Sequence, residues 1–360
     1  MESVKVIKKL GFGVLGTTYL IQIGKKKYIS KIEKILPEHV KPDLSTECIW
    51  REIEFSKFSC KYPNIFMQLI SWEILRDCDH IQKIPKGWRG GPKDRKWLAN
   101  KNKSTYCSKI IYSPVLDGTL QSFYDKINLK ETVLDTKQFW SMICQIMYSL
   151  YILKKYGWMH RDAHSLNIMY KITKQKTVKL GKINIKTNGL KWYLIDYGMI
   201  IHKDFPKSKE PEMRKREINC LNNITQDIAF FIHTSIKMPV WDIVRKKKIK
   251  IAPFKVLVEN IKLNLNKPRY AKSYQKMKKC IPKIYLKNTK IRETRTENIC
   301  LAVLCLINYP TLYHECMGLD VKKYKKYIIN YTDDLIKHYT YIVRHMNHPC
   351  KIIEYLKKLT

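Results

Sequence analysis

The sequence predicts an α+β fold in which a small β-rich part precedes a larger helical part. Three observations predict it. The first 75 positions contain stretches rich in strand-forming β-branched and aromatic residues. From about residue 130 onward, apolar residues recur at helical spacing instead. Two cation-rich stretches, residues 77–105 and 171–191, interrupt this plan and are typical of exposed loops or hairpins added to a compact body.

The β-rich part is predicted to hold short strands and one helix. The stretches VKVIKKLGFG and TTYLIQIGKKKYISKI have strand composition, and GKKK is typical of a hairpin turn. The stretch STECIWREIEFSKFSC predicts a helix, for which Ser45 or Thr46 could be the cap. Its apolar residues at near-helical spacing are Ile49, Ile53, Phe55 and Phe58.

The helical part begins with DTKQFWSMICQIMYSLYILKKYG, whose periodicity predicts a long helix that ends at Gly157. The stretches TQDIAFFIHTSI and TENICLAVLCLINY, and the region 321–356, predict further helices. The expected apolar face of the first helix consists of Phe139, Ile143, Ile146, Met147, Leu150 and Leu153.

Composition bounds the function less tightly than the fold. The formal charge of +38 favours contact with a polyanion such as nucleic acid or an anionic membrane surface, but an AT-rich genome would give a similar excess of lysine. Seven lysines and no acidic residue lie in 171–191, so that insertion and 77–105 are candidate polyanion contacts, with solvated surface as the other interpretation. No window has the roughly 18 uninterrupted apolar residues of a membrane span.

The cysteines and the N-terminus predict an intracellular, cytoplasmic location. MESVKVIKKLGFG lacks the apolar run of a signal peptide. None of the eleven cysteines belongs to a CxxC pair, and Cys300 and Cys305 lie in the apolar stretch ICLAVLCLI. We therefore expect buried, reduced thiols rather than metal ligands.

Glycines near the N-terminus form the first candidate binding motif. Gly11, Gly13 and Gly16 spell GxGxxG, and a strand follows them rather than the helix that a dinucleotide-binding fold requires. A flap whose backbone N–H groups cover phosphates is one interpretation. An ordinary hairpin turn is the other, and it is favoured on this motif alone.

A lysine and a glutamate strengthen the nucleotide interpretation. Lys31 lies in the apolar strand segment YISKI, where an ammonium group needs an anion to offset its desolvation. Glu52 lies in the helix that follows, with Glu47 and Glu54 nearby. A Lys31–Glu52 pair would hold the ammonium toward the phosphates of a nucleotide. A surface lysine and a solvated glutamate are the alternative.

Polar residues of WMHRDAHSLNIMY and WYLIDYGMI form the third candidate set. Asp162 and Asn167 are five positions apart, and Asp196 ends an apolar run. Asp162 could orient an attacking hydroxyl group and accept its proton. Asn167 and Asp196 could supply oxygen ligands to Mg²⁺. Each residue alone is typical of a loop, but the ordered set favours chemistry.

In this order the motifs resemble those of the eukaryotic-type protein kinase superfamily, over roughly residues 4–235. They are GFGVLG, YISK, REIEF, KYPNIFMQLI, HRDAHSLN and DYG, with a weaker match of EPE at 210–212. Asp227 in TQDIAFF is similar to the buried aspartate that supports the catalytic loop in that superfamily.

The resemblance implies a bilobal kinase-like fold with an N-lobe over 1–115 and a C-lobe over 116–360. It also implies Mg·ATP, with adenine near IIYSPV and Tyr112. The implied catalytic residues are Asp162, Lys31, Glu52 and His164. The implied nucleotide-binding residues are Gly11, Phe12, Gly13, Val14, Leu15, Gly16, Lys31 and Tyr112. The implied metal ligands are Asn167 and Asp196.

Two departures from the superfamily concern the acceptor and regulation. His164 occupies the place where Ser/Thr kinases usually carry a lysine two residues after the catalytic aspartate. It could donate a hydrogen bond to the phosphoryl group, or it could be a structural histidine that faces the core. Between the DYG motif and Glu212, Ser208 is the sole hydroxyl residue, which makes it the candidate for phosphorylation, with Arg161 as a partner for the phosphate.

The sequence therefore predicts an ATP-dependent Ser/Thr protein kinase that acts on protein substrates. Its Lys/Ile/Asn/Tyr-rich composition is similar to that of kinases of large DNA viruses, which would place it in the host cytoplasm and in the virion. A small-molecule phosphotransferase of kinase-like fold is one alternative. The other is a kinase-like basic module that binds nucleic acid or membrane.

Overall fold

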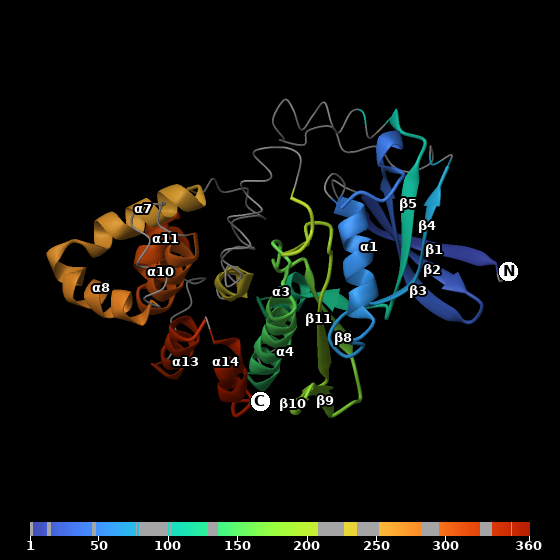
Figure 1. Cartoon of the computed structure of the whole chain (residues 1–360). Coiled ribbons are helices and arrows are strands. Elements are labelled where there is room, and N and C mark those ends of the chain that lie inside the picture. Colours follow the sequence, from blue (N-terminus) through green and yellow to red (C-terminus); the bar gives the residue numbers. More distant parts are fainter. Residues whose placement is uncertain are drawn as a thin grey trace. The chain divides into compact units, whose positions relative to one another are not determined.

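The computed structural model describes residues 3–12, 16–44, 48–76, 78, 100, 103–128, 136–207, 227–235, 252–281, 295–324, 333–346 and 348–360. The chain is a mixed α/β protein that divides into two compact units. We call Met1–Asp117 with Tyr193–Leu221 the sheet unit, and Gly118–Trp192 with Asn222–Thr360 the helical unit. Figure 1 labels their elements.

The sheet unit contains an antiparallel five-stranded sheet in the order β1-β2-β3-β5-β4. The 3₁₀ helix η1 (Pro37–His39) and helix α1 (Cys48–Ser59) connect β3 to β4. The strands are β1 (Val4–Phe12), β2 (Gly16–Ile23), β3 (Lys26–Lys34), β4 (Gln68–Leu75) and β5 (Cys107–Ser113). The predicted hairpin turn in GKKK is confirmed, because Ile23 pairs with Lys26 across a two-residue loop. Gly24 has φ of 56° in this loop, a backbone conformation that favours glycine.

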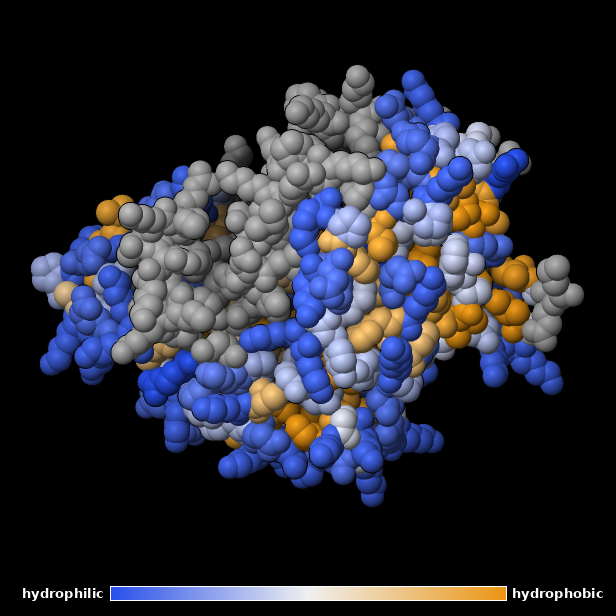
Figure 2. Space-filling model, in the orientation of Figure 1, coloured by the Kyte–Doolittle hydropathy of each residue, from blue (hydrophilic) through white to orange (hydrophobic). Residues whose placement is uncertain are grey.

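The core of the sheet unit lies between α1 and the sheet, and Figure 1 shows α1 beside the strands. Ile49 and Ile53 of α1 pack there with Ile110 and Tyr112 of β5. On the face seen in Figure 2, apolar residues gather over the strands of this unit, whereas the described surface of the helical unit is mostly hydrophilic. Exposed apolar residues on the two edge strands include Val4, Val6 and Leu10 of β1, and Ile70 and Trp72 of β4.

The helical unit is built around α4 (Thr136–Lys155). All six residues of the predicted apolar face of this helix are buried, and Gly157 follows its end with φ of 78°. The burial extends beyond one face, since Trp140, Met142 and Tyr148 are also buried. The other helices with printed bounds are α3 (Leu120–Asn128), α7 (Phe254–Leu265), α8 (Pro268–Cys280), α10 (Arg295–Asn308), α11 (Pro310–Cys316), α12 (Val321–Tyr324), α13 (Asp333–Arg344) and α14 (Pro349–Leu356).

Short strands complete the helical unit. A small sheet has the order β11-β8-β6, and β9 pairs with β10. The bounds are β6 (Gly118–Thr119), β7 (Trp158–Met159), β8 (Ile168–Ile172), β9 (Thr177–Leu180) and β10 (Ile183–Lys186). Strand β11 (Leu190–Leu194) runs from the helical unit into the sheet unit, which also holds β12 (Ile201–His202). Residues 227–235 include a further helical segment.

The lysine-rich stretch 171–191 contains the β9–β10 hairpin. Val178, Leu180 and Ile185 are buried on one face, whereas Lys179 and Lys186 are exposed. The Ser141 hydroxyl of α4 donates a hydrogen bond to the Lys186 carbonyl at 2.6 Å. Alternation along the strands thus fixes this insertion to α4, while the lysines at 174, 176, 179, 182 and 186 face solvent.

The expectation that all cysteines are reduced does not hold for one pair. Cys78 and Cys107 form a disulfide at the base of the 77–105 insertion. The two residues are 29 positions apart, and β-strand pairing brings the end of β4 to the start of β5, which sequence spacing does not reveal. Cys300 and Cys305 are buried free thiols, as expected. Among the described residues, no helix is both long and apolar enough to cross a membrane.

His314 of α11 gives the helical unit a predicted sensitivity to acid. Its side chain is buried, its Nδ1 has no hydrogen-bond partner, and burial lowers its pKa from 6.5 to about 4. Between these two values the unfolded chain binds a proton that the folded chain does not. The free energy of unfolding therefore falls as pH drops, and His314 lowers it by about 2 kcal/mol between pH 7.5 and 4.5.

The matched measurement is urea unfolding of the wild type and His314→Leu at both pH values. Groups that titrate in both proteins cancel in the difference. We expect the variant to gain about 2 kcal/mol relative to the wild type at pH 4.5. A difference that does not change with pH would contradict the prediction.

Candidate functional site

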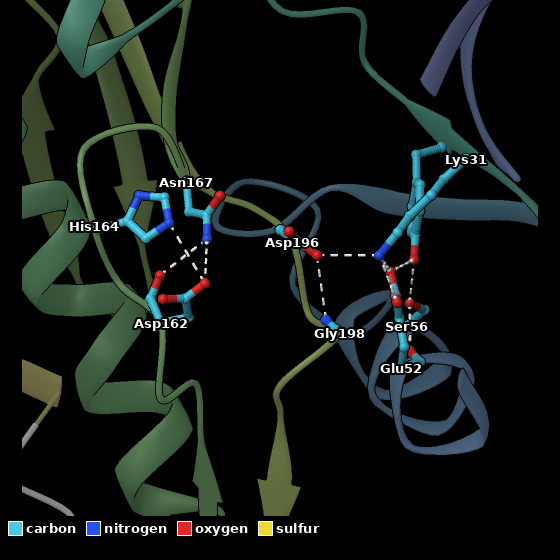
Figure 3. A network of polar contacts seen from close by, with 9 residues as sticks. Lys31, Glu52, Ser56, Asp162, His164, Asn167, Asp196 and Gly198 are labelled. Carbon is cyan, nitrogen blue, oxygen red and sulfur yellow. Dashed lines mark hydrogen bonds and ion pairs between the residues drawn. The ribbon is translucent and has the colours of Figure 1, made fainter. Parts of the chain in front are cut away.

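Lys31 of β3 is held by Glu52 of α1 within the sheet unit. The Lys31 Nζ lies 2.9 Å from Glu52 Oε1 and 2.7 Å from Oε2. Figure 3 shows the two side chains next to each other. The Glu52 side chain is 1% exposed and that of Lys31 is 15% exposed. Strand alternation turns Lys31 toward α1, and Glu52 comes from α1, which follows β3 and η1 in the chain. The apolar strand lysine thus has the anion that its burial requires.

Asp196 provides a second carboxylate for the same ammonium group. Its Oδ1 lies 3.0 Å from Lys31 Nζ and accepts a hydrogen bond from the Gly198 N–H at 3.3 Å. Asp196 has φ of 61°, in the left-handed region that is uncommon for residues other than glycine. Such strain at a charged residue is typical of functional positions.

The charges of this cluster are unbalanced. Burial lowers the pKa of Lys31, but Asp196 and Glu52 together raise it well above its usual value, so the ammonium stays charged. Burial raises the pKa of Glu52, and the neighbouring Lys31 ammonium group acts to lower it. One cation between two carboxylates leaves a net negative charge, and Asp196 is the more exposed carboxylate, with 46% of its side chain accessible. This net negative charge would attract a cation to the Asp196 carboxylate.

Asp227 anchors the chain ahead of Asp162 in the helical unit. Its buried carboxylate accepts the His160 N–H at 2.6 Å and the Arg161 N–H at 2.9 Å. Arg161 has φ of 70°, so the carboxylate holds a strained backbone in place. Burial raises the pKa of Asp227 to about 6, although both N–H groups act to lower it.

Asp162 and Asn167 lie in direct contact within the helical unit. The Asn167 Nδ2 donates to the Asp162 carbonyl at 3.0 Å and to Asp162 Oδ2 at 3.1 Å. The loop is closed by hydrogen bonds from the His164 N–H to the Asp162 carbonyl and from the Asn167 N–H to the His164 carbonyl. Because Nδ2 faces Asp162, the amide oxygen of Asn167 lies on the opposite side of the amide group (Figure 3). Asn167 Oδ1 and the Asp196 carboxylate are hard oxygen donors of the kind that suits Mg²⁺.

His164 lies beside Asp162 rather than in the core. Its Nε2 is 3.4 Å from Asp162 Oδ2, and its side chain is 34% exposed. The Leu166 N–H donates to Nδ1 at 3.2 Å, which assigns the hydrogen of a neutral ring to Nε2. In a neutral ring the hydrogen is therefore on the nitrogen that lies nearest the carboxylate that the sequence singles out.

Only part of the predicted nucleotide-binding set can be placed. Gly11 pairs with Thr18 near the end of β1, and a Cβ at Gly16 would lie 2.3 Å from the Ile32 carbonyl oxygen, so only glycine fits there. Phe12 is described as the last residue of β1, without its side chain. Gly13, Val14 and Leu15 lie outside the described residues, as do Glu47, Ser208, the EPE stretch and most of 77–105.

Tyr112 was expected near adenine, but its side chain is buried toward α1. Its hydroxyl contacts Glu52 and Ser56, so only the Tyr112 backbone remains for a base. Sequence reasoning missed Ser56 entirely. The signal was its position one helical turn after Glu52, on the same face of α1.

Tyr197 fixes the segment that carries Asp196. Its ring packs against Phe55 and Phe66, with centroids 4.3 and 6.4 Å away, and its hydroxyl donates to the Leu194 carbonyl at 2.6 Å. Burial raises the pKa of its phenol. Among the described residues, no group of three or more His, Cys, Asp or Glu side chains is placed to hold a metal ion by itself.

Comparison with known proteins adds little to this geometry. No family model and no curated protein matches the sequence. Among solved structures, the chain is similar to the autoinhibited serine kinase domain of the giant muscle protein titin, with 15% identity and a TM-score of 0.36. The match covers 55% of this chain and 46% of that one, so it spans less than half of the titin kinase structure.

Proposed function

We propose that the chain is a bilobal, kinase-like enzyme that transfers the γ-phosphoryl group of Mg·ATP to a Ser or Thr hydroxyl of a protein substrate. One observation carries the proposal. Lys31 is bonded to Glu52 and Asp196, and Asp162 is bonded to Asn167, so that each polar residue of the ordered motifs has a partner from the same set.

In the proposed reaction, Lys31 would hold the α- and β-phosphates while Glu52 fixes its ammonium group. Asp196 and Asn167 would hold Mg²⁺, which neutralises charge on the phosphates when bound. The backbone N–H groups near Gly11 and Gly16 would cover the phosphates. These contributions are positioning and electrostatic stabilisation, which supply most of the catalysis in phosphoryl transfer.

Asp162 would act on the acceptor. Its carboxylate orients the Ser or Thr hydroxyl and accepts the proton as the hydroxyl oxygen bonds to the γ-phosphorus. The bond between the γ-phosphorus and the β,γ-bridging oxygen breaks, and ADP leaves. Asn167 and His164 lie against the same carboxylate and would restrict its orientation.

The test is transfer of label from γ-labelled ATP with Mg²⁺ to a mixture of proteins and to the chain itself. Asp162→Asn should lower the rate by at least about a hundredfold, because the proton acceptor is lost. Asp204→Asn is the matched control. It removes the same charge, but from a side chain that is 71% exposed. Identification of the labelled amino acid distinguishes Ser and Thr acceptors, and panels of sugars and amines test small-molecule acceptors.

If no acceptor becomes labelled, and Asp162→Asn behaves like the wild type, the enzyme proposal fails. The binding-module alternative is favoured by one feature, the exposed lysines 174, 176, 179, 182 and 186 around the β9–β10 hairpin. This alternative requires polynucleotide binding whose affinity falls steeply with salt, and substitution of these lysines should weaken both the binding and its salt dependence. Substitution of five cations of α8 (Arg269, Lys272, Lys276, Lys278 and Lys279) is the matched control.

A further inference from the structure

Besides Lys31, the Glu52 carboxylate contacts the buried hydroxyl group of Tyr112, and the buried Ser56 hydroxyl lies next to that of Tyr112. The Tyr112 hydroxyl lies 3.1 Å from Glu52 Oε1 and 3.0 Å from Ser56 Oγ. Ser56 Oγ also lies 2.7 Å from the Glu52 carbonyl oxygen, a second acceptor for its hydroxyl hydrogen. Tyr112 is 5% exposed and Ser56 is fully buried, so no water competes for these contacts. Figure 3 shows Ser56 next to Glu52 on α1.

The hydrogens in this network can be assigned from the chemistry of the groups. An ionised carboxylate only accepts hydrogen bonds, so the single hydroxyl hydrogen of Tyr112 is directed at Oε1. Ser56 has a single hydroxyl hydrogen, which can be donated either to the Glu52 carbonyl or to the phenol oxygen, and in the second arrangement Ser56 holds the phenol in place. Burial and the neighbouring Glu52 raise the pKa of Tyr112 well above its usual value, which keeps the phenol a donor.

The two carboxylates that share Lys31 are therefore held very differently. Glu52 is buried. Both of its carboxylate oxygens accept hydrogen bonds from Lys31, and one of them also accepts from Tyr112. Asp196 is about half exposed, and its Oδ1 is shared between Lys31 and the Gly198 N–H of its own loop. Of the two ion pairs, the one with Asp196 is the easier to open.

We propose that Tyr112, supported by Ser56, is a positioning residue that anchors Glu52, so that Lys31 stays on Glu52 when Asp196 turns to a magnesium-bound nucleotide. This inference rests on the proposed function for the nucleotide, but the anchoring itself is a property of the free protein. Without the Tyr112 phenol, Glu52 would lose a charge-assisted hydrogen bond in a buried site. The Lys31 ammonium group would then exchange between ion pairs with Glu52 and with Asp196.

The first test needs no nucleotide. The labelling rate of Lys31 by an amine-acylating reagent is measured by mass spectrometry on the full-length chain. We expect Tyr112→Phe to raise this rate several-fold, because a poorly held Glu52 shields the ammonium less. Ser56→Ala should raise it less, and Tyr193→Phe is the control, since Tyr193 belongs to the same core. Circular dichroism verifies that each variant is folded at the labelling temperature.

The second test measures steady-state kinetics with Mg·ATP. Tyr112→Phe should raise KM for ATP about tenfold and change kcat less, because the Lys31–phosphate contact is made in both the ground state and the transition state. A merely structural role would lower the active fraction, and with it kcat, at unchanged KM. If the wild type neither binds ATP nor transfers phosphate, the proposed function fails while the labelling result still decides the anchoring. Labelling rates in Tyr112→Phe and Ser56→Ala equal to those of the wild type and Tyr193→Phe would overturn the inference.

Discussion

Replacing Lys31 with methionine is expected to lower the free energy of unfolding by about 3 kcal/mol, because it leaves the buried Glu52 carboxylate without its cation. Methionine keeps most of the length of the lysine side chain, so lost packing contributes little. Glu52 would retain only the Tyr112 hydroxyl as a donor from the network. In the same variant, phosphoryl transfer should fall by at least about a hundredfold, since no ammonium group meets the phosphates.

A double-mutant cycle separates charge from packing. Glu52→Gln removes the charge but keeps an oxygen that can accept from Tyr112. Lys31→Met combined with Glu52→Gln should therefore be more stable than Lys31→Met alone, as urea unfolding measures. Lys109→Met is the matched control on the same sheet. Its partner Glu73 is exposed, and the loss of this pair should cost less than about 1 kcal/mol. Equal losses for Lys31→Met and Lys109→Met would show that Glu52 is not an uncompensated buried charge.

The parts of the fold that could be predicted are those that local spacing determines. The glycine in GKKK and the apolar repeat of α4 were sufficient to place a hairpin and a long buried helix. The lysine of YISKI indicated an anionic partner, since burial of an unpaired ammonium costs too much. The partner came from the next helix, as expected. The functional roles of Lys31, Glu52, Asp162, Asn167 and Asp196 stay predictions that the proposed experiments test.

The parts that could not be predicted depend on register and on distant chain segments. Ile110, Ile111 and Tyr112 of β5 are all buried, so the strand has no polar and apolar alternation to reveal which side chains face α1. Pairing of Tyr112 with Ile29 and Leu69 sets that direction, and neither partner is near in sequence. The Cys78–Cys107 disulfide was missed for the same reason. His164 was ambiguous for a local reason, because residue spacing does not specify the loop geometry in which the Leu166 N–H bonds to its ring and Nε2 lies beside Asp162.

Asp227→Ala is the second substitution with a large expected effect, because one carboxylate satisfies two buried N–H groups. Removing it leaves the His160 and Arg161 N–H groups without that acceptor, next to a residue with φ of 70°. We expect a loss of about 2–3 kcal/mol in the free energy of unfolding. Released strain would let the backbone ahead of Asp162 relax to a different conformation. Phosphoryl transfer should then fall about a hundredfold, mostly in kcat, in the fraction that stays folded.

Asp227→Asn provides the graded comparison. Its amide keeps one accepting oxygen and replaces the other with a donor, so it can hold one of the two N–H groups but repels the second. Its stability and kcat should lie between those of the wild type and Asp227→Ala. Asp333→Asn is the surface control, because Asp333 is an exposed residue in the first turn of α13 and its loss should change kcat little. Stability that falls in Asp227→Ala while kcat per folded molecule stays constant would mean that the carboxylate supports the fold without positioning Asp162.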